Sequence, residues 1–254
     1  MSNDVIIRCA MEGNGVFKDT CRIFISQNNI ITLYDGYTIY PLCYNKLFTT
    51  TNTDNIAIRS ILGKEYYVNK LSELYKNGLN NFYILHKVYS ELSYQYNTKI
   101  QLNLPNGYSF NHAINADELN AFSKFKANLE SEEIGHNISQ KYSINMDSIK
   151  SRRPVFLKIR GEIIGVVCSN LWSTDISMVN TLYVDKKYRN KGIGTMLLSY
   201  YISFLFKTAK RVCLFYSENN LPAHKIYRNL GFIQKDKWIL IVYPELVVKT
   251  LYRP

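Results

Sequence analysis

Hydrophobic and polar positions alternate in short segments over the first part of the chain. Apolar and β-branched residues predict strands at residues 22–25, 30–34 and 37–40. The dipeptide Asp35-Gly36 predicts a tight hairpin between the last two of these strands. Residues 49–54 are polar and predict a loop.

Apolar residues then recur at helical spacing in two segments. Residues 68–75 and 82–96 each present one apolar face, so the pattern predicts two helices. Pro105-Asn106-Gly107 has turn chemistry, and we expect a domain boundary there. The first 105 residues are therefore expected to form a small α+β domain.

After the boundary, strand and helix patterns alternate. Asn115 followed by Glu118 resembles a capping box and predicts a helix start. The expected order is a strand at 108–113, the helix from 115, a helical piece within 132–150, strands at 155–159, 163–171 and 178–184, a helix at 196–206, a strand at 212–216, a helix after 220 and a strand at 237–242.

Residues 188–195, Tyr-Arg-Asn-Lys-Gly-Ile-Gly-Thr, connect the strand ending at Val184 to an apolar helix. The first N–H groups of a helix lack intrahelical partners and the helix dipole is positive there, so a diphosphate binds favourably. Gly192 and Gly194 lack Cβ atoms, so phosphate oxygens can approach their amides. No Gly-Lys-Ser/Thr ending is present, and the third glycine of a dinucleotide fingerprint would fall at Leu197. The segment therefore predicts either a diphosphate site of another type or an ordinary tight turn before a helix, and two glycines alone favour the turn.

A second motif follows the predicted strand 212–216. Residues 217–232 read Ser-Glu-Asn-Asn-Leu-Pro-Ala-His-Lys-Ile-Tyr-Arg-Asn-Leu-Gly-Phe and predict a helix that a glycine ends. Together the two motifs resemble the GNAT superfamily of acyl-CoA N-acyltransferases. The family pattern Arg/Gln-x-x-Gly-x-Gly/Ala is met by Arg189, Gly192 and Gly194. The pattern Asn-x-x-Ala-x-x-x-Tyr-x-x-x-Gly-Phe is met by Asn220, Ala223, Tyr227, Gly231 and Phe232.

This resemblance implies an α/β (α+β) fold of the GNAT type for residues 106–254. Its central sheet is mixed and mostly antiparallel, with helices on its flanks. The resemblance does not extend to residues 1–105, so we expect a separate, smaller α+β domain there. A degenerate GNAT-like half, a wall of the acceptor cleft and a dimer contact are the options for that domain.

By the resemblance, the cofactor is acetyl-CoA and the product is CoA. The first motif would hold the diphosphate, and the strand before it would pair with the pantetheine arm. The implied cofactor-binding residues are Leu182, Tyr183, Val184, Arg189, Asn190, Lys191, Gly192, Ile193, Gly194, Thr195, Asn220 and Ala223. Tyr227 would be the catalytic residue, a general acid for the departing thiolate. A core position on an amphipathic helix is the alternative for Tyr227.

The sequence does not identify the general base. Glu132 and Glu133 lie in the region that borders the acceptor site in the family, and Asp175 lies at the start of a strand. His112 and His136 carry imidazoles, which ordinarily titrate near neutral pH. None of the five matches a family base, and a chain of water molecules is the alternative.

Composition adds limits to this interpretation. The 254 residues are 46% hydrophobic and carry a formal net charge of +11, which favours a basic surface and an anionic cofactor. Lysines are scattered along the chain, so nucleic-acid binding is the less favoured option. No apolar stretch approaches the ~20 residues that span a bilayer, and a cytoplasmic protein without membrane association is expected. The five cysteines show no metal spacing and predict reduced thiols and no metal site.

The expected activity is transfer of an acetyl group from acetyl-CoA directly to a primary amine in a ternary complex. A small-molecule acceptor such as an aminoglycoside, polyamine or amino-acid derivative is favoured, with a protein amine or aminoacyl-tRNA as the alternatives. A non-catalytic acetyl-CoA-binding sensor or interaction module is the rival function. A homodimer is an open option.

Overall fold

The structure is a computed structural model, and the part of the chain that it describes comprises residues 6–7, 11–12, 22–25, 30–34, 38–44, 53–75, 82–93, 104–134 and 146–252. The chain divides into two compact units, the first made of residues 1–89 with 235–254 and the second of residues 90–234. The boundary expected at residue 105 lies inside the second unit. Residues 235–254 were expected in the second domain and lie in the first unit.

A sheet with the strand order β1-β2-β3-β4-β11 forms the first unit. Neighbouring strands are antiparallel except for β3 and β4, which are parallel. Helix α2 packs against β3 and β4. The elements are β1 (Arg22–Ile25), β2 (Ile30–Tyr34), β3 (Thr38–Tyr44), β4 (Thr53–Lys64), α2 (Glu65–Tyr75) and β11 (Ile233–Tyr252).

The expected strands at 22–25 and 30–34 and the helix at 68–75 are confirmed. The helix expected at 82–96 is wrong, because Tyr83–Ser93 form strand β5. Four consecutive residues, 87–90, are buried in this strand, which fits a strand covered on both faces and not one helical face. The loop expected at 49–54 is also wrong at its end, because β4 begins at Thr53, while 49–52 lie outside the described residues.

The second unit contains a mixed sheet with the order β5-β10-β9-β8-β7-β6, to which β5 contributes residues 90–93. The pairs β6–β7, β7–β8 and β8–β9 are antiparallel. The pair β9–β10 is parallel. The bounds are β6 (Tyr108–Asn111), β7 (Val155–Ile159), β8 (Glu162–Trp172), β9 (Ile176–Val184) and β10 (Arg211–Ser217). The mixed, mostly antiparallel sheet and the element order expected from residue 108 are confirmed.

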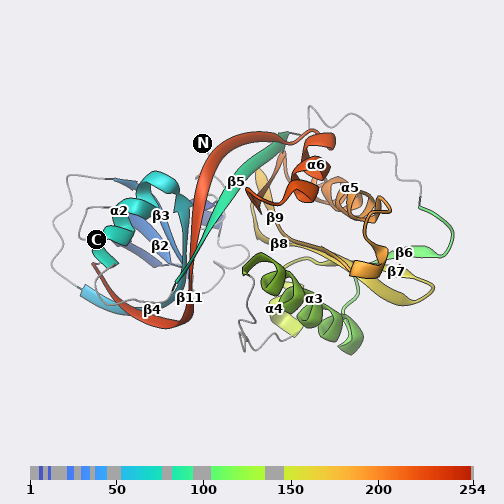
Figure 1. Ribbon diagram of the computed structural model, residues 1–254, viewed down its shortest axis with the longest axis horizontal. Helices are drawn as coiled ribbons and strands as arrows, with labels where there is room; N and C mark the ends of the chain where they lie inside the picture. The colour runs from blue at the N-terminus through green and yellow to red at the C-terminus, as the bar shows by residue number, and fades with distance from the viewer. Residues whose placement is uncertain are drawn as a thin grey trace. The chain divides into compact units, whose positions relative to one another are not determined.

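Helices cover both faces of this sheet (Figure 1). Helices α3 (Ala116–Ile134) and α4 (Met146–Lys150) pack against Val166 of β8 and its neighbours on one face. Helix α5 (Ile193–Leu205) lies on the other face, where Leu197 approaches Gly165. Adjacent residues of a strand point to opposite faces of the sheet. Gly165 therefore faces α5, and Val166 faces α3 and α4. The short helix α6 (Leu221–Asn229) follows β10.

The start of α3 has the capping box that the sequence predicts. The Asn115 side-chain oxygen accepts hydrogen bonds from the amides of Asp117 and Glu118, at 2.8 and 3.3 Å. The Glu118 carboxylate accepts one from the Asn115 amide at 3.2 Å. Among the described residues, no helix is both long enough and apolar enough to cross a membrane.

Tyr243 of β11 gives the first unit a titratable core group. Its side chain is 3% exposed, and burial raises its pKa from 10 to about 12. The folded state therefore holds the phenol proton more tightly than the unfolded chain, and this stabilisation is present below pH 10 and lost as the pH rises towards 12. We predict that wild type loses roughly 1.4 kcal/mol more unfolding free energy than Tyr243→Phe between pH 9 and pH 11. Urea titrations at both pH values measure this difference, and equal losses in the two proteins would contradict it.

Candidate active site

Strands β9 and β10 pair along only part of their length. The parallel register runs from Ile176 beside Arg211 to Val179 beside Leu214. Beyond that point β9 continues to Val184 and β10 to Ser217 without further pairing between them. On its other side β9 remains paired with β8 up to Val184. The end of β9 therefore has one backbone edge to which an extended chain can add as a strand does.

The chain turns directly from this edge into α5. The Asp185 carboxylate accepts a hydrogen bond from the Lys187 amide at 3.1 Å and caps the 3-10 turn η3 (Lys186–Tyr188). Asn190 and Gly192 then adopt left-handed φ values of 60° and 74°, which asparagine and glycine tolerate best. The sequence places these two residue types where the turn requires them.

Helix α5 begins without a side-chain cap. Its N-cap residue is Gly192, which has no side chain that could accept a hydrogen bond from the first amides of the helix. The Met196 amide donates to the Gly192 carbonyl at 3.0 Å, so the amides of Ile193, Gly194 and Thr195 precede the first such bond. These amides and the positive end of the helix dipole are the groups that the sequence predicts to bind a diphosphate.

Packing between α5, α6 and β9 brings the two motifs together. A Cβ atom on Gly194 would lie 3.4 Å from Cδ1 of Ile226 and 3.9 Å from Cγ2 of Val184. Ile226 is the residue before Tyr227 in α6. Gly194 therefore allows the first turn of α5 to lie against both α6 and the end of β9.

Asn220 has a structural task that sequence analysis missed. It is the N-cap of α6, and its side-chain oxygen accepts a hydrogen bond from the Ala223 amide at 3.1 Å. An asparagine three residues before that amide, with Pro222 in the first turn, was the available signal. The helix ends near Gly231, whose φ of 88° suits glycine.

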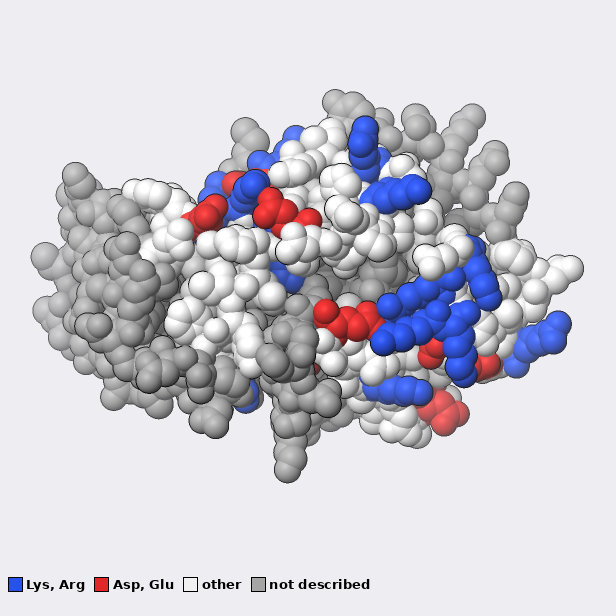
Figure 2. Space-filling view, viewed as in Figure 1, with Lys and Arg blue, Asp and Glu red and all other residues white. Residues whose placement is uncertain are grey.

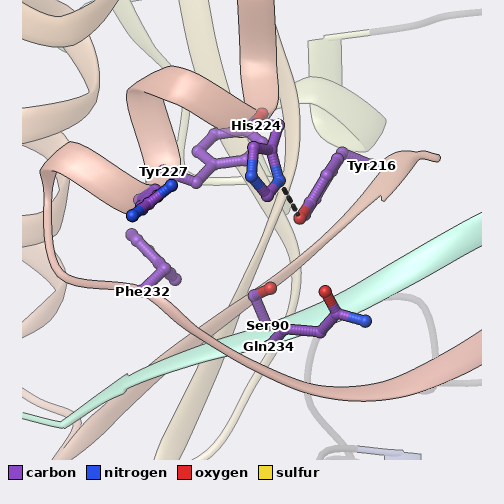
Figure 3. Close-up of a pocket in the computed structure, with 7 residues that line it drawn as sticks. Ser90, Tyr216, His224, Tyr227, Phe232 and Gln234 are labelled. Carbon is purple, nitrogen blue, oxygen red and sulfur yellow. Dashed lines mark hydrogen bonds between the residues drawn. The ribbon is translucent and has the colours of Figure 1, made fainter. Parts of the chain in front are cut away.

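Tyr227 is buried in α6 and borders a cavity of about 280 Å³ (Figure 3). Its ring lies 5.1 Å from that of Tyr216 and 5.9 Å from that of Phe232, between centroids. The Tyr216 hydroxyl forms a 2.9 Å hydrogen bond with Nδ1 of His224. The lining residues are Ser90, Tyr216, His224, Tyr227, Arg228, Phe232 and Gln234.

The hydrogen-bonded pair Tyr216–His224 was not expected from the sequence. Burial raises the pKa of the Tyr216 phenol, and a hydrogen bond with Ser90 offsets part of this rise. Tyr216 therefore stays a neutral phenol near pH 7. His224 lies three residues before Tyr227, a helical spacing that places both on one side of α6 and was the signal for this neighbourhood.

Arg189 does not extend freely toward the start of α5. Its Nε donates a hydrogen bond to the Val184 carbonyl at 2.9 Å. Its two terminal nitrogens donate to the two carboxylate oxygens of Glu132, at 3.0 and 3.1 Å. Its guanidinium carbon lies 5.0 Å from the centre of the Tyr183 ring. Burial lowers the pKa of Arg189, but the hydrogen bonds and charge of Glu132 outweigh burial and raise it.

Other expected cofactor-binding residues differ in what they present. Tyr183 directs its ring into the core under α3, 4.9 Å from the Phe125 ring, so only its backbone belongs to the edge of β9. Leu182 is half-buried, and Val184 packs near Gly194. The Lys191 ammonium donates a hydrogen bond to the Lys187 carbonyl at 3.3 Å.

The candidate bases have other partners in the structure. Glu132 is paired with Arg189, and the Asp175 carboxylate lies 2.6 Å from a terminal nitrogen of Arg211. His112 forms a 2.8 Å hydrogen bond with the Tyr200 hydroxyl, and burial followed by the charge of Lys207 lowers its pKa. The Glu133 side chain and His136 lie outside the described residues. Within the described part of the chain, no group of three or more His, Cys, Asp or Glu side chains is arranged to hold a metal ion.

Comparison with known proteins adds sequence relatives. Residues 120–232 match the model of the acetyltransferase (GNAT) family. Over 86 residues, the chain is 28% identical to an uncharacterized N-acetyltransferase of Methanocaldococcus jannaschii. This match covers 31% of the chain and 38% of that protein, so the chain spans well under half of its relative.

Solved structures resemble this fold over most of the chain. A GCN5-related N-acetyltransferase from Kribbella flavida has a TM-score of 0.59 at 13% identity, and the match covers 95% of each of the two chains. A tandem GNAT protein from the clavulanic acid biosynthesis pathway has a TM-score of 0.54 at 12% identity, covering 84% of this chain and 78% of that one. At these identities the likeness concerns the fold.

Replacement of each of the two loop glycines by alanine should lower the free energy of unfolding by a different amount. At Gly192 no atom lies within 4 Å of an added Cβ, but φ is 74°; at Gly194 the nearest atom is the flexible end of Ile226. We predict that Gly192→Ala loses about 1 kcal/mol of unfolding free energy through left-handed strain, whereas Gly194→Ala loses less than ~0.5 kcal/mol. Urea unfolding of both variants measures the order, and the reverse order would contradict this account of the loop.

Proposed function

Residues 120–232 belong to the GNAT acetyltransferase family, and on that premise we propose that the chain is an acetyl-CoA-dependent N-acetyltransferase. It transfers an acetyl group directly to a primary amine while both substrates are bound. The observation that carries the proposal is the uncapped start of α5 beside the end of β9, whose edge towards β10 is unpaired. The start of α5 also contacts the helix that bears Tyr227.

The residues at this place fit the cofactor. A diphosphate needs several N–H donors and positive potential, and the amides of Ile193, Gly194 and Thr195 at the helix start supply both. The added-Cβ position of Gly192 is open, so no side chain obstructs an approach to the loop there. Acetyl-CoA, when bound, supplies the thioester and the acetyl group.

Charge around the loop supports an anionic ligand. Lys186, Lys187 and Lys191 are exposed within six residues of sequence. Figure 2 shows a group of lysine and arginine side chains on the face in view. Their potential attracts a polyanion and raises its rate of encounter with the loop.

Each residue then has a defined task. The amides between Asn190 and Thr195 hold the diphosphate, and the backbone of Leu182 to Val184 pairs with the pantetheine arm. The Tyr227 hydroxyl gives its proton to the departing thiolate. An ammonium substrate loses one proton to solvent before it attacks and a second when its nitrogen is acylated. The second proton returns to Tyr227 through solvent, so the net reaction releases one proton.

A small-molecule amine is the proposed acceptor. The cavity that Tyr227 borders measures about 280 Å³, a size that suits a small organic group. The described residues that line it include Arg228 and no aspartate or glutamate, so acceptors that carry an acidic group are favoured over polyamines. Relative rates for an amino-acid derivative and a polyamine at equal concentration compare the two classes.

Tyr227→Phe tests the proposed acid. Removing the hydroxyl leaves the ring and its packing, so we predict a fall in kcat of about 10²-fold with the Kd for CoA changed less than ~3-fold. Release of free thiol from acetyl-CoA with a panel of primary amines gives the rates. Tyr200→Phe is the matched control, since it removes a hydroxyl from α5 whose hydrogen-bond partner is His112. Cofactor binding without turnover on any amine would refute the enzyme proposal and favour a binding module.

A further inference from the structure

The side chain of Arg189 joins β9 and α3 at the point where the diphosphate loop begins. It contacts the last carbonyl of β9 through Val184, the end of α3 through Glu132 and the face of Tyr183. Arg189 immediately precedes Asn190, the first left-handed residue of the loop. The orientation of this one side chain therefore sets where the loop starts relative to β9.

We infer that Glu132 is a positioning residue for the diphosphate loop, acting through Arg189. The inference rests on the proposed function and assigns to Glu132 a task other than proton transfer. Glu132 accepts two of the hydrogen bonds that hold the guanidinium, and the bidentate geometry fixes the plane as well as the position of that group. Without the carboxylate, the bond to the Val184 carbonyl and the interaction with Tyr183 remain among the described residues.

The pair also connects the two faces of the sheet. Glu132 belongs to α3, which covers the face opposite α5, and Arg189 lies in the segment that enters α5. The connection spans 57 positions in the sequence. A loop held at both β9 and α3 keeps its amides in place before the ligand arrives, which reduces the ordering cost of binding.

The Arg189 guanidinium is already engaged by the two carboxylate oxygens of Glu132, which leaves it less available for a direct contact with the diphosphate. Lys186 adds a second cation 3.5 Å from the same carboxylate, so the three groups together keep a positive net charge beside the loop. The Glu132 and Arg189 side chains are 31% and 35% exposed, so repulsion between Glu132 and a nearby phosphate is screened by water and salt. We therefore expect that losing the carboxylate weakens binding through lost positioning more than it strengthens binding through lost repulsion.

The test is a titration of the full chain with desulfo-CoA by calorimetry. For Glu132→Gln we expect the Kd to rise about 3- to 10-fold, the range of a charge-assisted bidentate contact. Glu130→Gln is the matched control, because Glu130 lies on the same helix and pairs with Lys126 at 3.5 Å. Its Kd should stay within about twofold of wild type. Circular dichroism of each variant verifies that the fold is retained.

A double-mutant cycle separates action through Arg189 from an independent effect. If Glu132 acts through Arg189, the double variant Glu132→Gln with Arg189→Gln has the same Kd as Arg189→Gln alone. In turnover, Glu132→Gln should raise the KM for acetyl-CoA and leave kcat within about twofold, whereas loss of a general base would lower kcat steeply.

Three results would overturn the inference. The first is unchanged or tighter binding of desulfo-CoA by Glu132→Gln, and the second is a Kd of the double variant that is raised by the product of the two single effects. The third is a large fall in the kcat of Glu132→Gln. A wild-type chain that fails to bind desulfo-CoA would overturn the proposed function itself, and the inference with it. The two failures are therefore distinguishable in one set of titrations.

Discussion

The proposed cofactor site depends on the limited pairing between β9 and β10. Two parallel strands that paired to their ends would leave no backbone edge open at the centre of the sheet. Here the pairing stops at Val179 and Leu214, while β8 continues to hold β9 up to Val184. The end of β9 is thus rigid on one side and available on the other, which is the condition for strand-like capture of an extended ligand.

Helix packing places the proposed anion site beside this edge. Gly194 permits contact among the first turn of α5, Ile226 of α6 and Val184 of β9. The same contact sets the position of the helix that carries Tyr227. On the opposite face of the sheet, α3 reaches the loop through the pair of Glu132 and Arg189. The loop therefore has packing support from one face and polar support from the other.

Sequence reasoning succeeded where the signal is local. Strand periodicity, the capping box at Asn115 and the glycines of the two motifs each depend on a few neighbouring residues, and the structure has these elements in the expected order. The segment 82–93 was misassigned because helical spacing of apolar residues also occurs in a strand buried on both faces. The pairs Glu132–Arg189 and Tyr216–His224 could not be foreseen, since the first joins residues 57 positions apart and the second depends on how α6 packs on β10.

The most direct test of the central claim is unfolding of the chain with and without desulfo-CoA, with pantetheine as the comparison ligand. Desulfo-CoA at ~100 times its Kd should add about 2.7 kcal/mol to the free energy of unfolding. Pantetheine, which lacks the diphosphate, should add much less at the same concentration. Equal stabilisation by both ligands, or none by millimolar desulfo-CoA, would contradict a diphosphate site at the start of α5.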